Sequence, residues 1–76
     1  MFHVKEHKAK KQAEELITEL QRKYENNYKD VAMAARTDAE NGIEAMHTSG
    51  ELSEKDYGKF RKRLDEYAEL MKDYHH

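Results

Sequence analysis

A helix stop signal followed directly by a helix start signal divides this chain near Gly50. Glycine can adopt the left-handed backbone conformation that commonly ends a helix. Three residues later, Ser53 is suited to cap the next helix, with Asp56 as its acidic capping partner. Leu52 and Tyr57 have the spacing of a hydrophobic staple across the same helix start. The sequence therefore predicts two helices that fold back on each other around Gly50.

Little in the composition favours anything other than helix. The chain has no proline and three glycines in 76 residues, which leaves few places for sheet turns or long loops. A charged fraction of 39% and a hydrophobic fraction of 37% would suit a disordered chain if the apolar residues were scattered. They recur instead at helical spacing, so nearly the whole chain is predicted to be helical. Because so short a chain buries only about 60% of its unfolded surface, we expect a thin core.

Three apolar stripes predict three helices, over residues 4–25, 28–47 and 54–74. The first stripe consists of Ala9, Ala13, Leu16, Ile17, Leu20 and Tyr24. The second consists of Tyr28, Val31, Ala35, Ala39, Ile43 and Met46, on a helix face also rich in Ala32 and Ala34. The third consists of Tyr57, Phe60, Leu64, Tyr67, Met71 and Tyr74. Because large rings fit against small alanines, we expect the third helix to pack on the second.

An all-α, up-down-up three-helix bundle is the favoured fold. The alternative is one long helix over residues 9–47, because the second stripe continues the first without a change of phase. That helix and the shorter last helix would form a hairpin that has to dimerise. Asn27 and Asp30 have the spacing of a helix cap but do not force a break. The thin core favours a homodimer in both cases.

Two glycines lie at equal distances on either side of the predicted turn. In an antiparallel hairpin, Gly42 and Gly58 could face each other. Each costs about 1 kcal/mol relative to alanine inside a helix, which a close approach of the two backbones would offset. The other interpretation is that Asn41 and Gly42 form only a weak point or a local kink.

The formal net charge of −2 hides a strong segregation of charge along the chain. The start of the chain is basic, with Lys5, Lys8, Lys10 and Lys11. Between residues 37 and 57 the single base Lys55 stands against six acids, which are Asp38, Glu40, Glu44, Glu51, Glu54 and Asp56. In a three-helix bundle these two segments are expected at the same end of the molecule.

The residues that would carry catalysis or metal binding are sparse. Glu44 and His47 have the Glu-x-x-His spacing of di-iron bundles, but those sites need a second copy of the motif. His3 and His7 lie one turn apart without any visible supporting ligands. The two serines lie in the predicted turn, and no glycine-rich phosphate loop is present. We therefore expect no enzyme activity, no metal and no cofactor.

The sequence carries no recognisable targeting or membrane segment. The N-terminal lysines are not followed by an apolar run, and no window approaches the roughly 20 apolar residues of a membrane span. The absence of cysteine is compatible with a reducing compartment. We expect a soluble cytoplasmic protein, and His75 and His76 are interpreted as a tail.

The main functional prediction is a small protein-binding module, such as an inhibitor, adaptor or regulator of a larger cytoplasmic protein. Several apolar side chains fall outside the stripes, namely Met33 and Leu70, together with Phe2 and Val4 before the first stripe. Exposed apolar groups of this kind commonly mark an interface. The acidic turn is a second candidate surface, because Glu44, Glu51, Glu54 and Asp56 could occupy a basic groove on a partner, including a groove normally used by nucleic acid.

The alternative function is a DNA-binding regulator. Four basic residues cluster near the start of a helix that follows a turn, as in a recognition helix, and these are Lys59, Arg61, Lys62 and Arg63. The neighbouring acids Glu51, Glu54 and Asp56 would repel phosphates, and the chain as a whole is negatively charged. Nucleic acid is therefore the less favoured partner.

Overall fold

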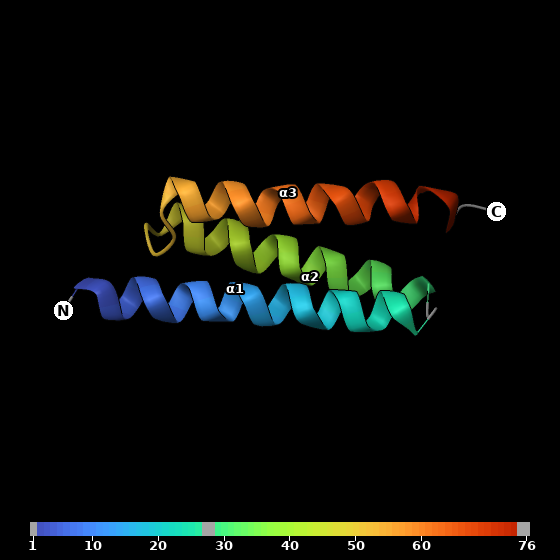
Figure 1. Cartoon of the computed structure of the whole chain (residues 1–76), viewed down its shortest axis with the longest axis horizontal. Coiled ribbons are helices and arrows are strands. Elements are labelled where there is room, and N and C mark those ends of the chain that lie inside the picture. Colours follow the sequence, from blue (N-terminus) through green and yellow to red (C-terminus); the bar gives the residue numbers. More distant parts are fainter. Residues whose placement is uncertain (1, 27–28, 75–76) are drawn as a thin grey trace.

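The computed structural model describes residues 2–26 and 29–74 as three long helices that lie side by side (Figure 1). Helix α1 is Phe2–Glu25, α2 is Lys29–Thr48 and α3 is Glu54–Leu70, and a final 3-10 turn, η1, is Met71–Tyr74. The chain reverses direction twice, so α1 and α3 run parallel and α2 runs antiparallel to both (Figure 1). These described residues contain no strand. The predicted all-α, up-down-up three-helix bundle is confirmed.

The helix bounds lie close to the predicted ones. Helix α1 begins two residues earlier than predicted, and α2 ends one residue later. The last α-helix ends at Leu70 and its final turn is a 3-10 helix, whereas the prediction extended one helix to residue 74. The alternative of one long first helix is wrong, because α1 and α2 are separate helices that pack against each other. Of the predicted break at Asn26 and Asn27, Asn26 follows the end of α1 as a turn, with its N–H donating to the Arg22 carbonyl at 3.1 Å, and Asn27 lies outside the described residues.

The turn around Gly50 forms as predicted. Gly50 has a φ of +85°, and its N–H donates to the His47 carbonyl at 3.1 Å, while the Glu51 N–H donates to the Met46 carbonyl at 2.9 Å. This pair of hydrogen bonds is the Schellman motif, which satisfies carbonyl groups at the end of α2. The Ser53 hydroxyl oxygen then accepts from the Asp56 N–H at 3.2 Å and caps α3. Both elements of the helix stop and start signal are therefore confirmed.

A single apolar core runs along the bundle axis. The buried side chains of the described residues are Ala9, Ala13, Ile17, Leu20, Ala32, Ala35, Ala39, Ile43, Met46, Leu52, Phe60, Leu64, Tyr67 and Met71. Leu16, Tyr24 and Tyr57 are partly buried against this core. At the far end from the Gly50 turn, Tyr24 of α1 and Tyr67 of α3 meet edge to face, with ring centroids 5.6 Å apart. The predicted stripes of α1 and α3 therefore face the core, apart from Tyr74, whose side chain lies outside the described residues.

The predicted core-facing side of α2 is wrong at two positions, and Tyr28 of its stripe lies outside the described residues. Val31 is 44% exposed and Ala34 is exposed, whereas the neighbouring Ala32 and Ala35 are buried. One residue corresponds to a rotation of about 100° around a helix, so a small error in phase moves a side chain from the core to the surface. The alanines that do face the core share it with Phe60, Leu64 and Tyr67 of α3, which is the predicted match of large against small side chains.

The two helical glycines do not face each other, so that prediction is wrong. A Cβ atom at Gly42 would lie 2.8 Å from Cδ1 of Leu16, so Gly42 faces α1. A Cβ atom at Gly58 would have no neighbour within 4 Å, so Gly58 faces open space. Gly42 therefore allows α1 and α2 to pack closely, and Gly58 has no such role within this chain.

Candidate functional site

A row of charged and polar side chains crosses the contact between α2 and α3. We call this row the α2–α3 charge seam, and it consists of Arg36, Glu40, Glu44, Tyr57 and Arg61. Arg61 Nη1 donates to Glu40 Oε2 at 2.7 Å and to Glu44 Oε2 at 3.1 Å. The hydrogen bond to Glu40 is the main reason that the pKa of Arg61 is raised above its ordinary value. Arg36 Nε donates to the Leu64 carbonyl at 3.0 Å, so both arginines join the two helices.

The end of the charge seam next to the Gly50 turn contains Tyr57 and His47. The Tyr57 hydroxyl donates to Glu44 Oε2 at 2.5 Å, and this hydrogen bond raises the pKa of Tyr57. The His47 ring stacks on the Tyr57 ring, with centroids 3.7 Å apart, and His47 Nε2 lies 2.7 Å from Glu54 Oε1. The Glu44 and His47 pair therefore serves contacts between α2 and α3. Within the described residues, no group of three or more potential ligands is arranged to hold a metal ion.

The predicted acidic surface is partly used in these internal contacts. Glu44 binds Tyr57 and Arg61, and Glu54 binds His47, although the Glu54 side chain remains 86% exposed. Glu51 accepts a hydrogen bond from the Ser49 hydroxyl at 2.8 Å. Asp56 follows the cap in the first turn of α3. The four carboxylates are thus close to one end of the bundle, but they do not form a row of free charges.

The basic start of α1 lies at the same end of the bundle as the acidic turn, as predicted (Figure 1). The lysines on this segment whose side chains are described are exposed, and they are Lys8, Lys10 and Lys11. Among the residues described, none of them forms an ion pair with Glu51, Glu54 or Asp56. The opposite charges share one end of the molecule without pairing directly.

The four basic residues of the DNA-binding alternative point in different directions. Arg61 belongs to the charge seam and also lies 3.4 Å from a carboxylate oxygen of Asp65. Arg63 Nε lies 3.7 Å from a carboxylate oxygen of Glu66. Lys59 and Lys62 are exposed. The cluster seen in the sequence is therefore divided, and its Arg61 is already surrounded by carboxylates.

The two predicted apolar contact residues do not form one patch. Met33 is 40% exposed and lines a shallow pocket between α2 and the end of α3 with η1, beside Ala68 and Met71. Leu70 is 51% exposed, but it is two residues from Ala68 and so about 200° away around the helix. The side chains of Phe2 and Val4 lie outside the described residues.

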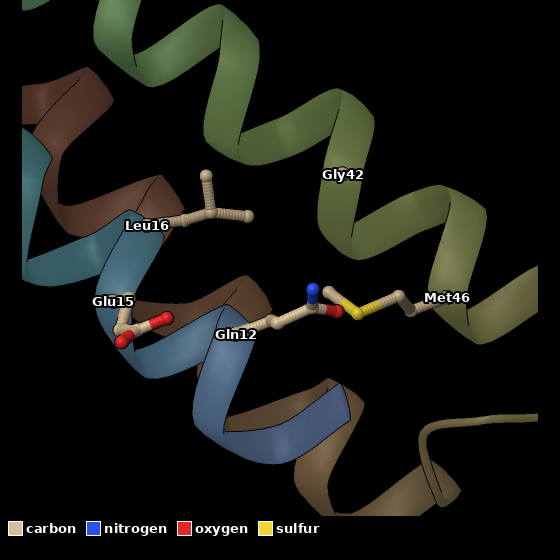
Figure 2. Close-up of a pocket in the computed structure, with 5 residues that line it drawn as sticks. All are labelled: Gln12, Glu15, Leu16, Gly42 and Met46. Carbon is tan, nitrogen blue, oxygen red and sulfur yellow. The ribbon is translucent and has the colours of Figure 1, made fainter. Parts of the chain in front are cut away.

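An apolar groove between α1 and α2 was missed by sequence reasoning (Figure 2). This Gly42 groove holds a pocket of about 410 Å³ lined by Gln12, Glu15, Leu16, Gly42 and Met46. The Leu16 side chain extends across the groove toward α2, and the Gln12 side chain extends toward Met46 (Figure 2). The cost of a glycine inside a helix was a visible signal in the sequence, but the sequence does not tell which helix Gly42 faces.

Comparison with known proteins adds no family to this description. No protein-family model matches the chain, and no curated protein or solved structure is significantly similar to it. None of the helices in the described ranges has both the length and the apolar character needed to cross a membrane.

Proposed function

We propose that this chain is a small non-enzymatic protein-binding module that acts as an inhibitor, adaptor or regulator of a larger cytoplasmic protein. The observation that carries this proposal is the Gly42 groove, where two antiparallel helices leave an apolar hollow between them. Grooves of this kind bind the apolar face of a helix from a partner protein. A partner helix lying there would complete a four-helix arrangement on the side of α1 and α2 that faces away from α3.

The charges beside the groove define the chemistry of the partner. Leu16 and Met46 supply its apolar floor, and Glu15 supplies a carboxylate at its rim. Glu51 lies next to the same end, because its N–H donates to the Met46 carbonyl. An amphipathic partner helix with basic residues beside its apolar ridge would complement both carboxylates. The acidic end of the bundle, including Glu54 and Asp56, would extend this contact toward a basic surface such as a nucleic-acid groove.

Nucleic acid remains the less favoured partner. Binding to phosphates needs cations that are free to replace counterions along the backbone. Arg61 contacts Glu40, Glu44 and Asp65, so its charge is already balanced within the chain. The exposed Lys59 and Lys62 form a basic surface that is small for a DNA-binding regulator.

The test compares three baits in affinity capture from a lysate of the native host. The first is the intact chain, the second carries Glu15→Lys and Glu51→Lys, and the third is a matched control with Glu14→Lys and Glu25→Lys. All four glutamates are at least partly exposed, and both variants change the net charge equally. We expect one protein to be retained by the intact chain and the control, and to be lost with the groove variant.

Binding of that protein to the purified chain is then followed by nuclear magnetic resonance of the backbone amides. We expect the largest signal changes at Leu16, Gly42 and Met46, because these residues line the groove. Equal loss of the partner with both variants, or changes confined to Lys59 and Lys62, would contradict the proposal. Binding to duplex DNA at low salt that weakens steeply as salt rises would support the DNA-binding alternative instead.

A further inference from the structure

A stripe of charged side chains follows the outward face of α3. This α3 charge stripe consists of Lys55, Lys59, Lys62, Glu66 and Glu69, which are all exposed. Their spacing alternates between four and three residues, as in the seam of a coiled coil, and places them along one face of the helix. The three residues in the first half are bases and the two in the second half are acids. The face is therefore basic at one end and acidic at the other.

The order of these charges is not explained by the stability of α3 itself. The helix dipole favours acids near the N-terminus and bases near the C-terminus, which is the opposite order. Lys62 precedes Glu66 by four residues, and this orientation is weaker than glutamate before lysine. The three lysines of the stripe form no ion pair with any described residue. Among the described residues, Glu66 pairs with Arg63 of its own helix at 3.7 Å, and Glu69 pairs with Lys72 of the adjoining η1 at 3.3 Å.

The same stripe complements itself when two copies of α3 lie antiparallel. Lys62 and Glu66 are each two positions from Leu64, and Lys59 and Glu69 are each five positions from it. A two-fold axis level with Leu64 therefore places Lys62 opposite Glu66 of the second copy and Lys59 opposite its Glu69. Symmetry repeats each pair, as in any isologous interface.

Gly58 gives independent support for close contact at this face. A glycine inside an exposed helix costs about 1 kcal/mol relative to alanine. A Cβ atom at Gly58 would meet nothing within 4 Å, so packing inside the chain does not require the glycine. A shallow groove of about 460 Å³ lies over this part of α3, lined by Gly58, Lys62 and Glu66 among others. The absent side chain would allow a second helix to approach closely.

We infer that two copies of this chain associate through the outward faces of their α3 helices, in antiparallel orientation. The outward face of α3 is thus the surface for the self-association predicted from the sequence. This contact does not use the Gly42 groove, which lies between the other two helices, so a dimer leaves that groove open. If the chain does not self-associate, a partner can still be captured through the Gly42 groove. If no partner is captured, the chain can still dimerise through α3.

The test uses two variants with opposite charge changes in the stripe. Lys59→Glu with Lys62→Glu makes the stripe mostly acidic, and Glu66→Lys with Glu69→Lys makes it wholly basic. We expect the intact chain to form dimers in sedimentation at an ionic strength of about 0.01 M, where charges act over about 30 Å. Each variant alone should have the mass of one chain, 9.0 kDa, and an equal mixture of the two should recover the dimer.

Two further variants separate this surface from general charge effects and from misfolding. Lys8→Glu with Lys11→Glu changes the net charge as much as the acidic stripe variant does, and it should dimerise like the intact chain. Gly58→Ala should raise the thermal stability of the monomer but weaken dimerisation about tenfold, equivalent to about 1.4 kcal/mol. An intact chain that stays at 9.0 kDa at every concentration, or a mixture no heavier than its separate components, would overturn the inference.

Discussion

Helix α2 contacts its two neighbours by different chemistry. Toward α1 it offers a glycine, and Leu16 fills the space that a side chain at Gly42 would occupy. Toward α3 it offers Glu40 and Glu44, which bind Arg61 across the interface. The first contact depends on volume, because a single added methyl group would have to displace Leu16. The second combines buried packing of alanines against the large side chains of α3 with these ion pairs, whose charged side chains are only partly buried. Changes in salt and pH should therefore act mainly on the contact between α2 and α3.

The largest loss of stability is expected from a cavity in the core that all three helices share. Leu20 of α1 has no exposed surface, so Leu20→Ala should reduce the free energy of unfolding by about 2–5 kcal/mol. The free energy of unfolding of a chain of this size is about 4–11 kcal/mol in total, so the variant would lose a large share of its stability. Urea denaturation measures this loss. We expect this loss to be the same at low and high salt. A loss that changes strongly with salt would contradict the claim that side-chain volume controls the packing of α1 against α2.

A smaller loss is expected from filling the space between α1 and α2. Gly42→Val should reduce the free energy of unfolding by about 1–3 kcal/mol, because its side chain would collide with Leu16. Shortening the opposing residue in the double variant with Leu16→Ala should recover part of that loss. The matched control is Gly58→Val, because a Cβ atom at Gly58 would meet nothing within 4 Å inside the chain. Valine is a better helix former than glycine, so Gly58→Val should lose little or no stability, and an equal change in the two valine variants would show that contact with Leu16 does not set the cost.

Removal of the bridging arginine should have a smaller effect that depends on salt. Arg61→Met should reduce the free energy of unfolding by about 1 kcal/mol at low ionic strength, because Glu40 and Glu44 lose their cation. At about 1 M salt, where charges act over about 3 Å, the loss should shrink. Arg63→Met is the control, because its ion pair is exposed and longer. A loss at Arg61 that is identical at both salt concentrations would argue against a charge-dependent contact.

The smallest expected effect is a change of stability with alkaline pH. The hydrogen bond to Glu44 raises the pKa of Tyr57, so the folded chain keeps the phenol proton at pH values where the unfolded chain loses it. This contribution is complete below about pH 10, the ordinary tyrosine pKa, and is lost as pH rises through the folded pKa. Stability should therefore fall more steeply above pH 10 in the intact chain than in Tyr57→Phe. Parallel pH profiles in urea denaturation would exclude this linkage.

Local signals account for the parts of the fold that could be predicted. Gly50 and Ser53 mark the turn through the conformations and hydrogen bonds of their own neighbours, and helical periodicity identifies most of the core. Val31 was misplaced because its exposure depends on the rotation of α2 by one residue. The turn and the helical periodicity are encoded within a few positions of the sequence, whereas the rotation of α2 about its own axis is not.

The candidate site was harder to predict because it joins residues that are distant in sequence. Arg61 was predicted as a member of a basic cluster, but it binds Glu40 and Glu44, which come from another helix. The Gly42 groove depends on which side of α2 faces α1, and the sequence pattern does not fix that side. The segregation of charge along α3 was visible in the sequence, but its exposure on one face became clear only with the helices in place.

The central claim is that salt acts more strongly on the contact between α2 and α3 than on the contact between α1 and α2. Its most direct test is native-state hydrogen exchange at low salt and at about 1 M salt, with each backbone amide followed separately. Because salt screens exposed and partly buried charges, raising it should lower the protection of amides in α3 around Arg61. Amides of α1 and α2 near Leu16 and Gly42 should keep their protection. An equal loss of protection in all three helices, or none in α3, would contradict the account.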